Sequence, residues 1–267
     1  MARTKIVGVI GFVLTVSGWT TQAVAVDGIK LLSQPKTFPI VISTPGSYRL
    51  KKNITVPDEN TTAIQITVSN VTLDLNGFSI IGPTVCSGNP TVTSCTPVGS
   101  GTGIQATANN VTILNGMITG MGNIGIAMGQ GRIEGVTVSN NGLDGLNGAI
   151  YSSISRVVAT NNGRIGIGTG AFCNISNSVS SGNKDRGIGA ADGSSVSGNV
   201  VVNNGGDGIW TNSDSSVIGN TVRFSGGYGI FMFDGGYANN VSTGNTLGAV
   251  SGGINMGHNV CNLSLCP

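Results

Sequence analysis

The 267-residue sequence predicts an all-β fold, a solenoid in which short parallel strands stack coil upon coil. The first observation is an internal repeat that opens on a glycine followed by Ile or Leu and recurs in steps of 20–22 residues. The second is that the short apolar segments are β-branched and lack the 3.6-residue spacing of helical repeats. The third is the Gly, Asn, Ser and Asp between these segments, because such residues supply the positive φ angles of tight corners.

Aligning the repeats produces three apolar columns. The opening glycines are Gly103, Gly125, Gly145, Gly166, Gly187, Gly208 and Gly229. The first column reads Ile104, Ile126, Leu146, Ile167, Ile188, Ile209 and Ile230; the second reads Ile154, Ile175, Val196 and Val217; the third reads Val158, Val179, Val200 and Thr221. We expect all three columns to stack inside the solenoid, in about eight or nine coils.

The first 25 residues have the pattern of a signal peptide. Arg3 and Lys5 precede an apolar run over residues 6–16, and Ala23-Val24-Ala25 fits an A-x-A cleavage site. The run is short for a membrane span, which needs about 20 apolar residues, so an uncleaved anchor is the less favoured alternative. The pattern predicts a mature chain from Val26 with no membrane span, exported to the periplasm, the cell surface or the medium.

The charge balance argues against nucleic acid as a partner. Charged residues make up only 9% of the chain, against about 25% in typical globular proteins. Without Arg3 and Lys5, the 13 basic residues fall to 11 and balance the 11 acidic ones. No basic run or stripe is left that would follow a phosphate backbone.

Export permits disulfides, and two local pairs are the simplest arrangement of the five cysteines. Cys86 with Cys95 would close a polar loop, and Cys261 with Cys266 would close the C-terminal tail. Cys173 is left over and is expected to be a small buried side chain. The predicted organisation is a cap and first strands over residues 26–62 and a solenoid over 63–258. A loop insertion covers 82–102, and a disulfide-bearing tail covers 259–267.

Several stretches resemble a known superfamily. "GIWTNSDSSVIGNTVRFSGGY" and "GIGAADGSSVSGNVVVNNGGD" resemble the repeats of the pectate-lyase-like superfamily, and "ISTPGSYRLKKNITV" resembles the cap of secreted bacterial β-helix proteins. The resemblance covers residues 39–258 and implies a right-handed parallel β-helix. It does not select an activity, because the superfamily holds lyases, hydrolases, epimerases and depolymerases, and the motif sets of these enzymes are absent.

An outward aromatic pair is the main candidate for a binding surface. Ile209 belongs to an inward column, so Trp210 points outward, and Phe231 takes the same position one coil later. Tyr228, Arg186 and Asp207 belong to a neighbouring turn column. Aromatic rings stack on sugars, and Arg and Asp hydrogen-bond their hydroxyls or carboxylates, so these residues predict carbohydrate binding. The alternatives are packing between the two rings, cover by the C-terminal tail, and an Arg186–Asp207 surface ion pair.

Three aspartates at one corner are candidate catalytic residues. Asp192, Asp214 and Asp234 lie at nearly equivalent positions of successive coils. Stacked carboxylates could form a general acid/base pair or hold Ca²⁺. The alternative is turn chemistry, since each precedes Gly or Ser as in an Asx turn. His258 lies past the regular coils and is expected to be structural.

The sequence therefore predicts an exported β-helix protein that interacts with polysaccharide, whether or not it catalyses a reaction. One rival is a lyase, glycoside hydrolase or epimerase of acidic polysaccharide, which would lose turnover when the three aspartates become Asn. The other rival is a structural or adhesive solenoid that self-associates through its aromatic face.

Overall fold

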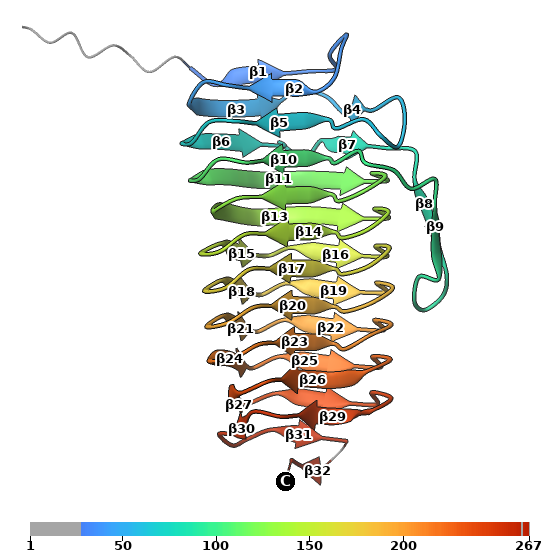
Figure 1. The fold of residues 1–267 in the computed structure, drawn as a ribbon, viewed down its shortest axis with the longest axis vertical. Helices are drawn as coiled ribbons and strands as arrows, with labels where there is room; N and C mark the ends of the chain where they lie inside the picture. The colour runs from blue at the N-terminus through green and yellow to red at the C-terminus, as the bar shows by residue number, and fades with distance from the viewer. Residues whose placement is uncertain (1–27, 263, 267) are drawn as a thin grey trace, which may run out of the picture.

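The structure, a computed structural model, describes residues 28–262 and 264–266. This part of the chain contains strands and turns and no helix. Its coils stack along one long axis into a single parallel β-helix, with the first coils at one end and the last at the other (Figure 1). The predicted fold class is confirmed. The predicted signal peptide lies outside the described residues.

Each coil contributes strands to three faces, and the first face is a ten-stranded sheet with one strand per coil. Its strands are β2 (Ile40–Ile42), β5 (Ile64–Ile66), β10 (Ile104–Ala106), β12 (Ile126–Met128), β14 (Leu146–Gly148), β17 (Ile167–Thr169), β20 (Ile188–Ala190), β23 (Ile209–Thr211), β26 (Tyr228–Met232) and β29 (Gly248–Ser251). The expected eight or nine coils are therefore too few. The coils of β2, β5 and β29 do not open on a glycine followed by Ile or Leu, so the repeat marks only seven of the ten.

The second and third faces join into one twenty-stranded sheet. The second face holds β3 (Gly46–Leu50), β6 (Val71–Asp74), β15 (Ser153–Ser155), β18 (Asn174–Ser176), β21 (Ser195–Ser197), β24 (Ser215–Ile218), β27 (Gly235–Ala238) and β30 (Ile254–Asn255). The third holds β4 (Ile54–Thr55), β7 (Ser79–Ile81), β16 (Val158–Thr160), β19 (Val179–Ser181), β22 (Val200–Val202), β25 (Thr221–Arg223), β28 (Val241–Thr243) and β31 (Val260–Cys261). The long strands β11 (Val111–Thr119) and β13 (Gly131–Ser139) run through the corner and belong to both faces. At the two ends, β1 (Lys30–Leu32) pairs with β3, and β32 (Ser264–Leu265) pairs antiparallel with β31.

Two of the three predicted columns form the core. Every member of the Ile104 column and of the Ile154 column is fully buried. The prediction for the third column is wrong, because Val158, Val179 and Val200 are 37–42% exposed. In each of these coils, one residue between the second-face strand and the third-face strand has a positive φ, as Arg156 does. This conformation shifts the alternation of inward and outward side chains by one residue. The buried column is consequently Ala159, Ser180, Val201 and Val222.

Two ladders of buried asparagines line the inner side of the corners. The first consists of Asn141, Asn162, Asn183 and Asn204, and the second of Asn199, Asn220, Asn240 and Asn259. In both, Oδ1 of an asparagine accepts hydrogen bonds from the backbone N–H and the Nδ2 group of the asparagine one coil before, at 2.9–3.2 Å. The ladders satisfy backbone groups that the corners turn inward. Asn161 and Asn203, each next in sequence to a member of the first ladder, take a positive φ instead.

Cys173 belongs to a third ladder, which is otherwise made of serines. Its sulfur accepts the N–H of Ser152 at 3.3 Å, and its own N–H donates to Oγ of Ser194 at 3.2 Å. The thiol is free and buried, as expected. Burial raises the pKa of Cys173 above its ordinary value of 9.0.

We expect Cys173→Ser to leave stability at neutral pH within about 1 kcal/mol, because serine is the residue that the ladder uses elsewhere. The substitution should also reduce the loss of stability at alkaline pH. The thiol ionises near its ordinary pKa in the unfolded chain but keeps its proton in the folded one, so the free energy of unfolding is intact below about pH 9 and falls above it. Urea unfolding at about pH 8 and about pH 10 measures the difference. Equal alkaline losses in the two proteins would contradict this assignment; some loss remains in both, because burial also raises the pKa of Tyr237.

The repeat glycines stand where a side chain has no space. A Cβ on Gly187 would lie 2.4 Å from Cγ1 of Val201 and 2.7 Å from the carbonyl oxygen of Gly208. Cβ positions built on Gly103, Gly125, Gly145, Gly166, Gly208 and Gly229 also fall within 2.8 Å of a neighbouring atom. The repeat therefore opens on glycine because the third face and the next coil pack against this backbone.

The corners between faces use the left-handed backbone conformation. Most residues there are Gly, Asn or Asp, which adopt a positive φ at low cost, whereas other residues lose about 1–2 kcal/mol. Tyr151, Phe172 and Phe224 depart from this rule with φ of 56–57°. His258 is another exposed corner residue, with φ of 58°, which agrees with a structural role.

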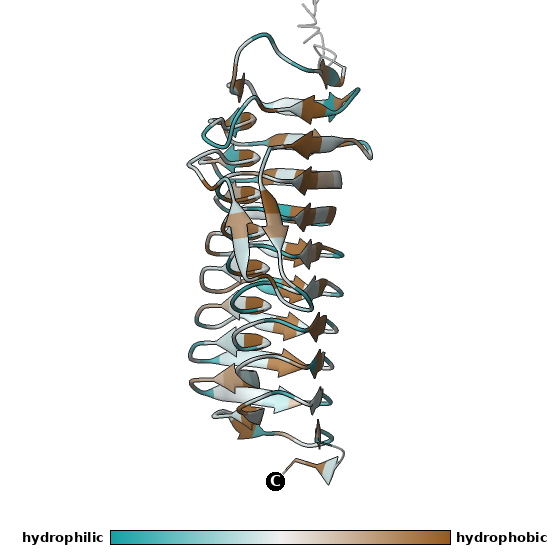
Figure 2. Ribbon diagram, turned by 90° about the vertical axis from the view of Figure 1, so that its right-hand side faces the viewer, coloured by the Kyte–Doolittle hydropathy of each residue, from teal (hydrophilic) through white to brown (hydrophobic). Residues whose placement is uncertain are grey.

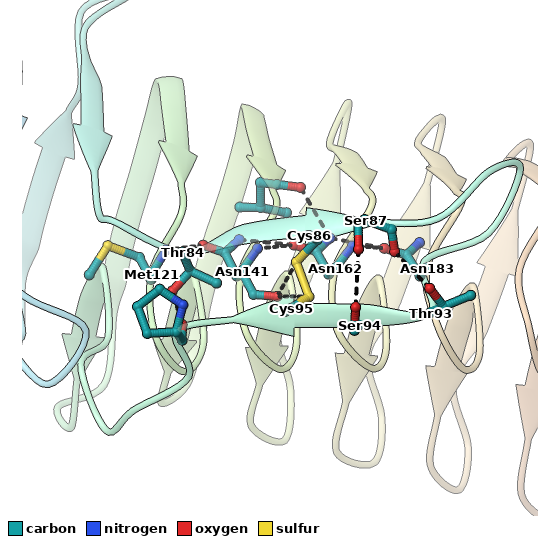
Figure 3. Close-up of a disulfide and its surroundings, with 12 residues drawn as sticks. Thr84, Cys86, Ser87, Thr93, Ser94, Cys95, Met121, Asn141, Asn162 and Asn183 are labelled. Carbon is teal, nitrogen blue, oxygen red and sulfur yellow. Dashed lines mark hydrogen bonds between the residues drawn. A yellow bond between two sulfur atoms is a disulfide. The ribbon is translucent and has the colours of Figure 1, made fainter.

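The inserted loop (residues 82–102, the arm) lies along the side of the solenoid. It contains the hairpin of β8 (Val85–Ser87) and β9 (Ser94–Thr96), which runs across several coils (Figure 2). The Cys86–Cys95 disulfide is formed and lies beside the first asparagine ladder (Figure 3). Further along, the Val92 N–H donates to Gly182 at 2.9 Å and the Thr91 hydroxyl donates to the carbonyl of Asn203 at 2.8 Å.

The predicted Cys261–Cys266 disulfide is also formed. The described part of the tail pairs with β31 at the last coil, and Cys266 N–H donates to Asn259. Trp210, on β23, lies two first-face strands before the end of that sheet. The described part of the tail therefore does not cover Trp210.

Candidate functional site

The outward residues of the first face form one continuous column. Over the eight strands from β5 to β26, their in-register order is Gln65, Gln105, Ala127, Asn147, Gly168, Gly189, Trp210 and Phe231. Neighbouring strands are about 4.8 Å apart, so the column extends for about 34 Å along the axis. Its middle members are small and its last members are aromatic, which leaves a depression that ends at a ring.

This depression is a groove of about 390 Å³. Gly168 and Gly189 form its floor, and Trp210 stands at its C-terminal end. One side is lined by Asp144, Arg164, Ile165 and Arg186 from the turns that lead into the strands, and the other by Ala149, Ile150, Gly170 and Ala191 from the turns that follow them. Two further hollows continue the groove toward β5: one shares Asn147 with the groove, and the next shares Gln105 with that hollow.

The glycine floor is not required by the backbone. The nearest atom to a Cβ on Gly168 would be 3.6 Å away, and the nearest to one on Gly189 would be 3.9 Å away, both ordinary contact distances. Neither residue has a positive φ. Glycine inside a strand weakens that strand, and it is often found where a ligand or another backbone approaches the strand closely. These two positions are therefore the strongest sign of a site on this face, and the sequence analysis did not select them.

Trp210 is partly buried and carries a cation on its ring. Cζ of Arg186 lies 4.3 Å from the ring centroid, a cation–π contact. The predicted Arg186–Asp207 ion pair is absent from the described ion pairs. Asp207 instead accepts the N–H of Tyr228 at 2.8 Å. Arg186 and Trp210 thus form one unit at the end of the groove, while Asp207 has a turn role.

Phe231 continues the aromatic surface one coil beyond Trp210. Its ring is tilted by 43° against that of Tyr228, with centroids 6.2 Å apart. The structure therefore brings together four of the five predicted binding residues: Arg186 with Trp210, and Tyr228 with Phe231.

Asp144 and Arg164 form an ion pair in the groove wall that was not predicted from the sequence, with Asp144 buried and Arg164 half exposed. Asp144 is 1% exposed, and its two oxygens accept hydrogen bonds from Nε and Nη2 of Arg164 at 2.7 and 2.6 Å. It also accepts the N–H of Ile165 at 3.1 Å. The bond to Asp144 raises the pKa of the Arg164 guanidinium, against the opposing effect of burial. A bidentate pair of this kind fixes the wall next to the floor.

The three candidate catalytic aspartates lie outside this groove lining, exposed at the corner after the first face. Asp192 accepts the N–H of Ser213 at 3.2 Å, and Asp234 accepts the N–H of Asp214 at 2.6 Å. Asp214 itself has a φ of 56°. These contacts are those of turn residues.

Within the described residues, no three His, Cys, Asp or Glu side chains are grouped closely enough to hold a metal ion. No described segment forms a helix that could cross a membrane.

The sequence matches no protein-family model and no curated protein. Three solved structures illustrate the structural similarity. Tailspike protein 2 of bacteriophage CBA120 has a TM-score of 0.57 and 15% identity, over 85% of this chain and 38% of that one. A double mutant of the periplasmic alginate epimerase AlgG has a TM-score of 0.55 and 14% identity, over 83% and 70%. The Dettilon tailspike protein has a TM-score of 0.54 and 16% identity, over 86% of this chain and 56% of that one.

The chain thus spans little more than half of the Dettilon tailspike. At these identities the similarity concerns the fold, and the chain shares its parallel β-helix with phage tailspikes and alginate epimerases.

Proposed function

We propose that this protein binds an extended polysaccharide along the first-face groove. The observation that carries the proposal is the glycine floor of Gly168 and Gly189, which leaves room that the backbone would allow a side chain to fill. A linear polymer suits a groove that follows a column of in-register residues. At the end of the floor, Trp210 offers a ring and Arg186 a guanidinium. One protein of the same fold is an alginate epimerase, and alginate is a polysaccharide.

We propose polysaccharide binding, and not catalysis, as the main function. The carboxylate in the groove lining is Asp144, and both of its oxygens are occupied by Arg164. Asp192 and Asp234 bond to backbone amides at the corner. Catalysis, as a lyase, glycoside hydrolase or epimerase of acidic polysaccharide, is the second candidate function, and it has its own test. Incubation with alginate should then yield new chain ends or altered sugar units, and Asp→Asn at positions 192, 214 and 234 should abolish that change.

Export is part of the proposal. Two disulfides suit an oxidising compartment outside the cytosol, where small thiol reductants do not keep cysteines reduced. The periplasm, the cell surface and the medium all meet this condition. The predicted cleavage after Ala25 would be checked by the N-terminal sequence of the protein recovered from its native source.

Filling the groove should weaken polymer binding. Gly189→Leu places a branched side chain on the floor beside Arg186, so we expect the Kd for alginate, measured by calorimetry, to rise at least about tenfold. Trp210→Ala should produce a loss of similar size because it removes the ring at the end of the floor. Ser197→Leu, an equally bulky change on the outward side of the second face, is the control and should bind normally.

Two results would contradict the proposal. One is that neither alginate nor the neutral polymer dextran binds the wild-type protein, which would favour a structural or adhesive solenoid. The other is that Gly189→Leu binds as well as Ser197→Leu. Circular dichroism of each variant establishes that the fold is retained.

A further inference from the structure

A second candidate site lies at the corner between the first and second faces. Tyr151 and Phe172 occupy equivalent positions of successive coils there, with ring centroids 5.3 Å apart and planes 14° from parallel. Each of the two residues is 55% exposed. Their stacking therefore forms an aromatic ledge at the surface and does not contribute to the core.

The backbone at this ledge is unfavourable for aromatic residues. Both residues have a positive φ, which is uncommon for bulky side chains. The same corner uses Asn70, Asn110, Gly193 and Asp214 in other coils, and these residues tolerate that φ. The exposed rings gain little burial in return. Strain that the fold does not compensate is found at functional sites.

A polar hollow adjoins one side of the ledge. It measures about 450 Å³ and lies over the two preceding coils, so Phe172 stacks on the other side of the Tyr151 ring. Besides Tyr151, it is lined by Asn109, Asn110, Thr112, Gln130, Gly131 and Arg132, and we call it the corner slot. The slot combines one aromatic ring with three carboxamides, a hydroxyl and a guanidinium.

Arg132 is the charged residue in the lining of the corner slot. Arg132 and Arg156 both form ion pairs with Glu134, so two guanidinium groups share one carboxylate. The side chain of Arg132 is 54% exposed and has five N–H donors, more than one carboxylate can accept. An anionic group in the slot would be favoured at low ionic strength.

We propose that the corner slot binds a single sugar ring. The apolar face of the sugar stacks on Tyr151, its hydroxyls bond to the carboxamides of Asn110 and Gln130, and a carboxylate on the ring pairs with Arg132. A sugar fits better than a purely apolar partner because the lining is polar apart from one ring. This site does not depend on the groove: Tyr151 lines the slot, whereas the groove is lined by the neighbouring Ile150.

Saturation-transfer NMR on the purified protein tests the proposal with glucuronate and glucose as probes. We expect transfer to both sugars, with a Kd several-fold lower for glucuronate at low salt. Tyr151→Asn should weaken binding at least about tenfold. Its melting temperature should stay the same or rise, because asparagine adopts the corner φ more readily than tyrosine.

Phe224→Asn is the matched control. Phe224 is an exposed aromatic with φ of 56° on a different corner, where it lies against Gly244 and Arg223 and lines no part of the slot. The Phe224→Asn variant should gain stability in the same way and keep its affinity for glucuronate and glucose. Tyr151→Asn is expected to lower the affinity for the monosaccharides through the slot, whereas Gly189→Leu is expected to lower the affinity for alginate through the groove, so failure of the groove and failure of the slot are distinguishable.

Four outcomes would overturn the proposal. Tyr151→Asn could bind both sugars normally, or Phe224→Asn could lose as much affinity as Tyr151→Asn. In the third, no transfer is seen and Tyr151→Asn abolishes self-association, which would make the ledge a protein-contact patch. A lowered melting temperature together with lost binding would assign Tyr151 a structural role and count against the site.

Discussion

Replacing Asn183 by leucine should lower the free energy of unfolding by about 3–5 kcal/mol. The carboxamide of Asn183 accepts from the backbone N–H and Nδ2 of Asn162 at 3.0 and 2.9 Å, and donates to the carbonyl of Ala159 at 3.2 Å. Leucine would leave these buried groups without that partner, at a cost of about 1–3 kcal/mol for each group left unsatisfied. Urea unfolding followed by far-UV circular dichroism measures the change.

Asn161→Gly is the control for the ladder. Asn161 precedes a ladder asparagine but is exposed, with φ of 54°, and glycine takes that angle without strain. We expect a change within about 0.5 kcal/mol. If Asn183→Leu costs no more than Asn161→Gly, the ladder does not stabilise the fold in the way its hydrogen bonds indicate.

Gly187→Ala should be the second strongly destabilising change, at about 1–3 kcal/mol or more. The new Cβ would stand 2.4 Å from Cγ1 of Val201 and 2.7 Å from both Nδ2 of Asn204 and the carbonyl oxygen of Gly208. Val201 and Asn204 are buried, and the third contact is backbone, so none of them can move away cheaply. The shift of the urea midpoint measures the effect.

A second glycine in the same coil provides the comparison. Gly189 is two residues away. The atom nearest to a Cβ added there would be Cδ of Arg186, at 3.9 Å. Gly189→Ala should therefore raise stability by about 0.4–1 kcal/mol, through the lower entropy of the unfolded chain. Opposite signs at the two positions are the expected result. A loss of similar size at both would mean that the spaces around them do not differ as the structure indicates.

The periodic part of the fold could be predicted from the sequence, and its phase at the corners could not. The Ile104 and Ile154 columns are buried as expected, because a strict repeat forces equivalent residues into equivalent environments. The Val158 column was expected inside because its residues are β-branched and recur every 21 residues, but the positive φ of Arg156 changes the phase of the side chains before this column. Arginine gives little sign of such a conformation, whereas the glycine at Gly198, one of its equivalents, does.

The candidate site, too, could be predicted only in part from the sequence. Trp210 and Phe231 were predicted to point outward together, and the register places them side by side on the first face. Gly168 and Gly189 were not selected, because in a chain with 44 glycines the sequence does not tell a crowded glycine from an open one. The Asp144–Arg164 pair was missed for another reason. Its partners stand at different positions of neighbouring coils, so alignment by columns does not bring them together.

The arm changes how the solenoid can unfold. A solenoid whose coils contact only their neighbours behaves as a one-dimensional chain that can open from either end, one coil at a time. The hydrogen bond from Thr91 to Asn203 joins residues 112 positions apart, so the coils between them cannot open separately while the arm stays docked. The arm therefore makes the middle of the molecule one cooperative unit, and fraying is confined to the coils before the arm and to those after Asn203. It also delays completion of folding, since the hairpin is synthesised long before the coils on which it docks.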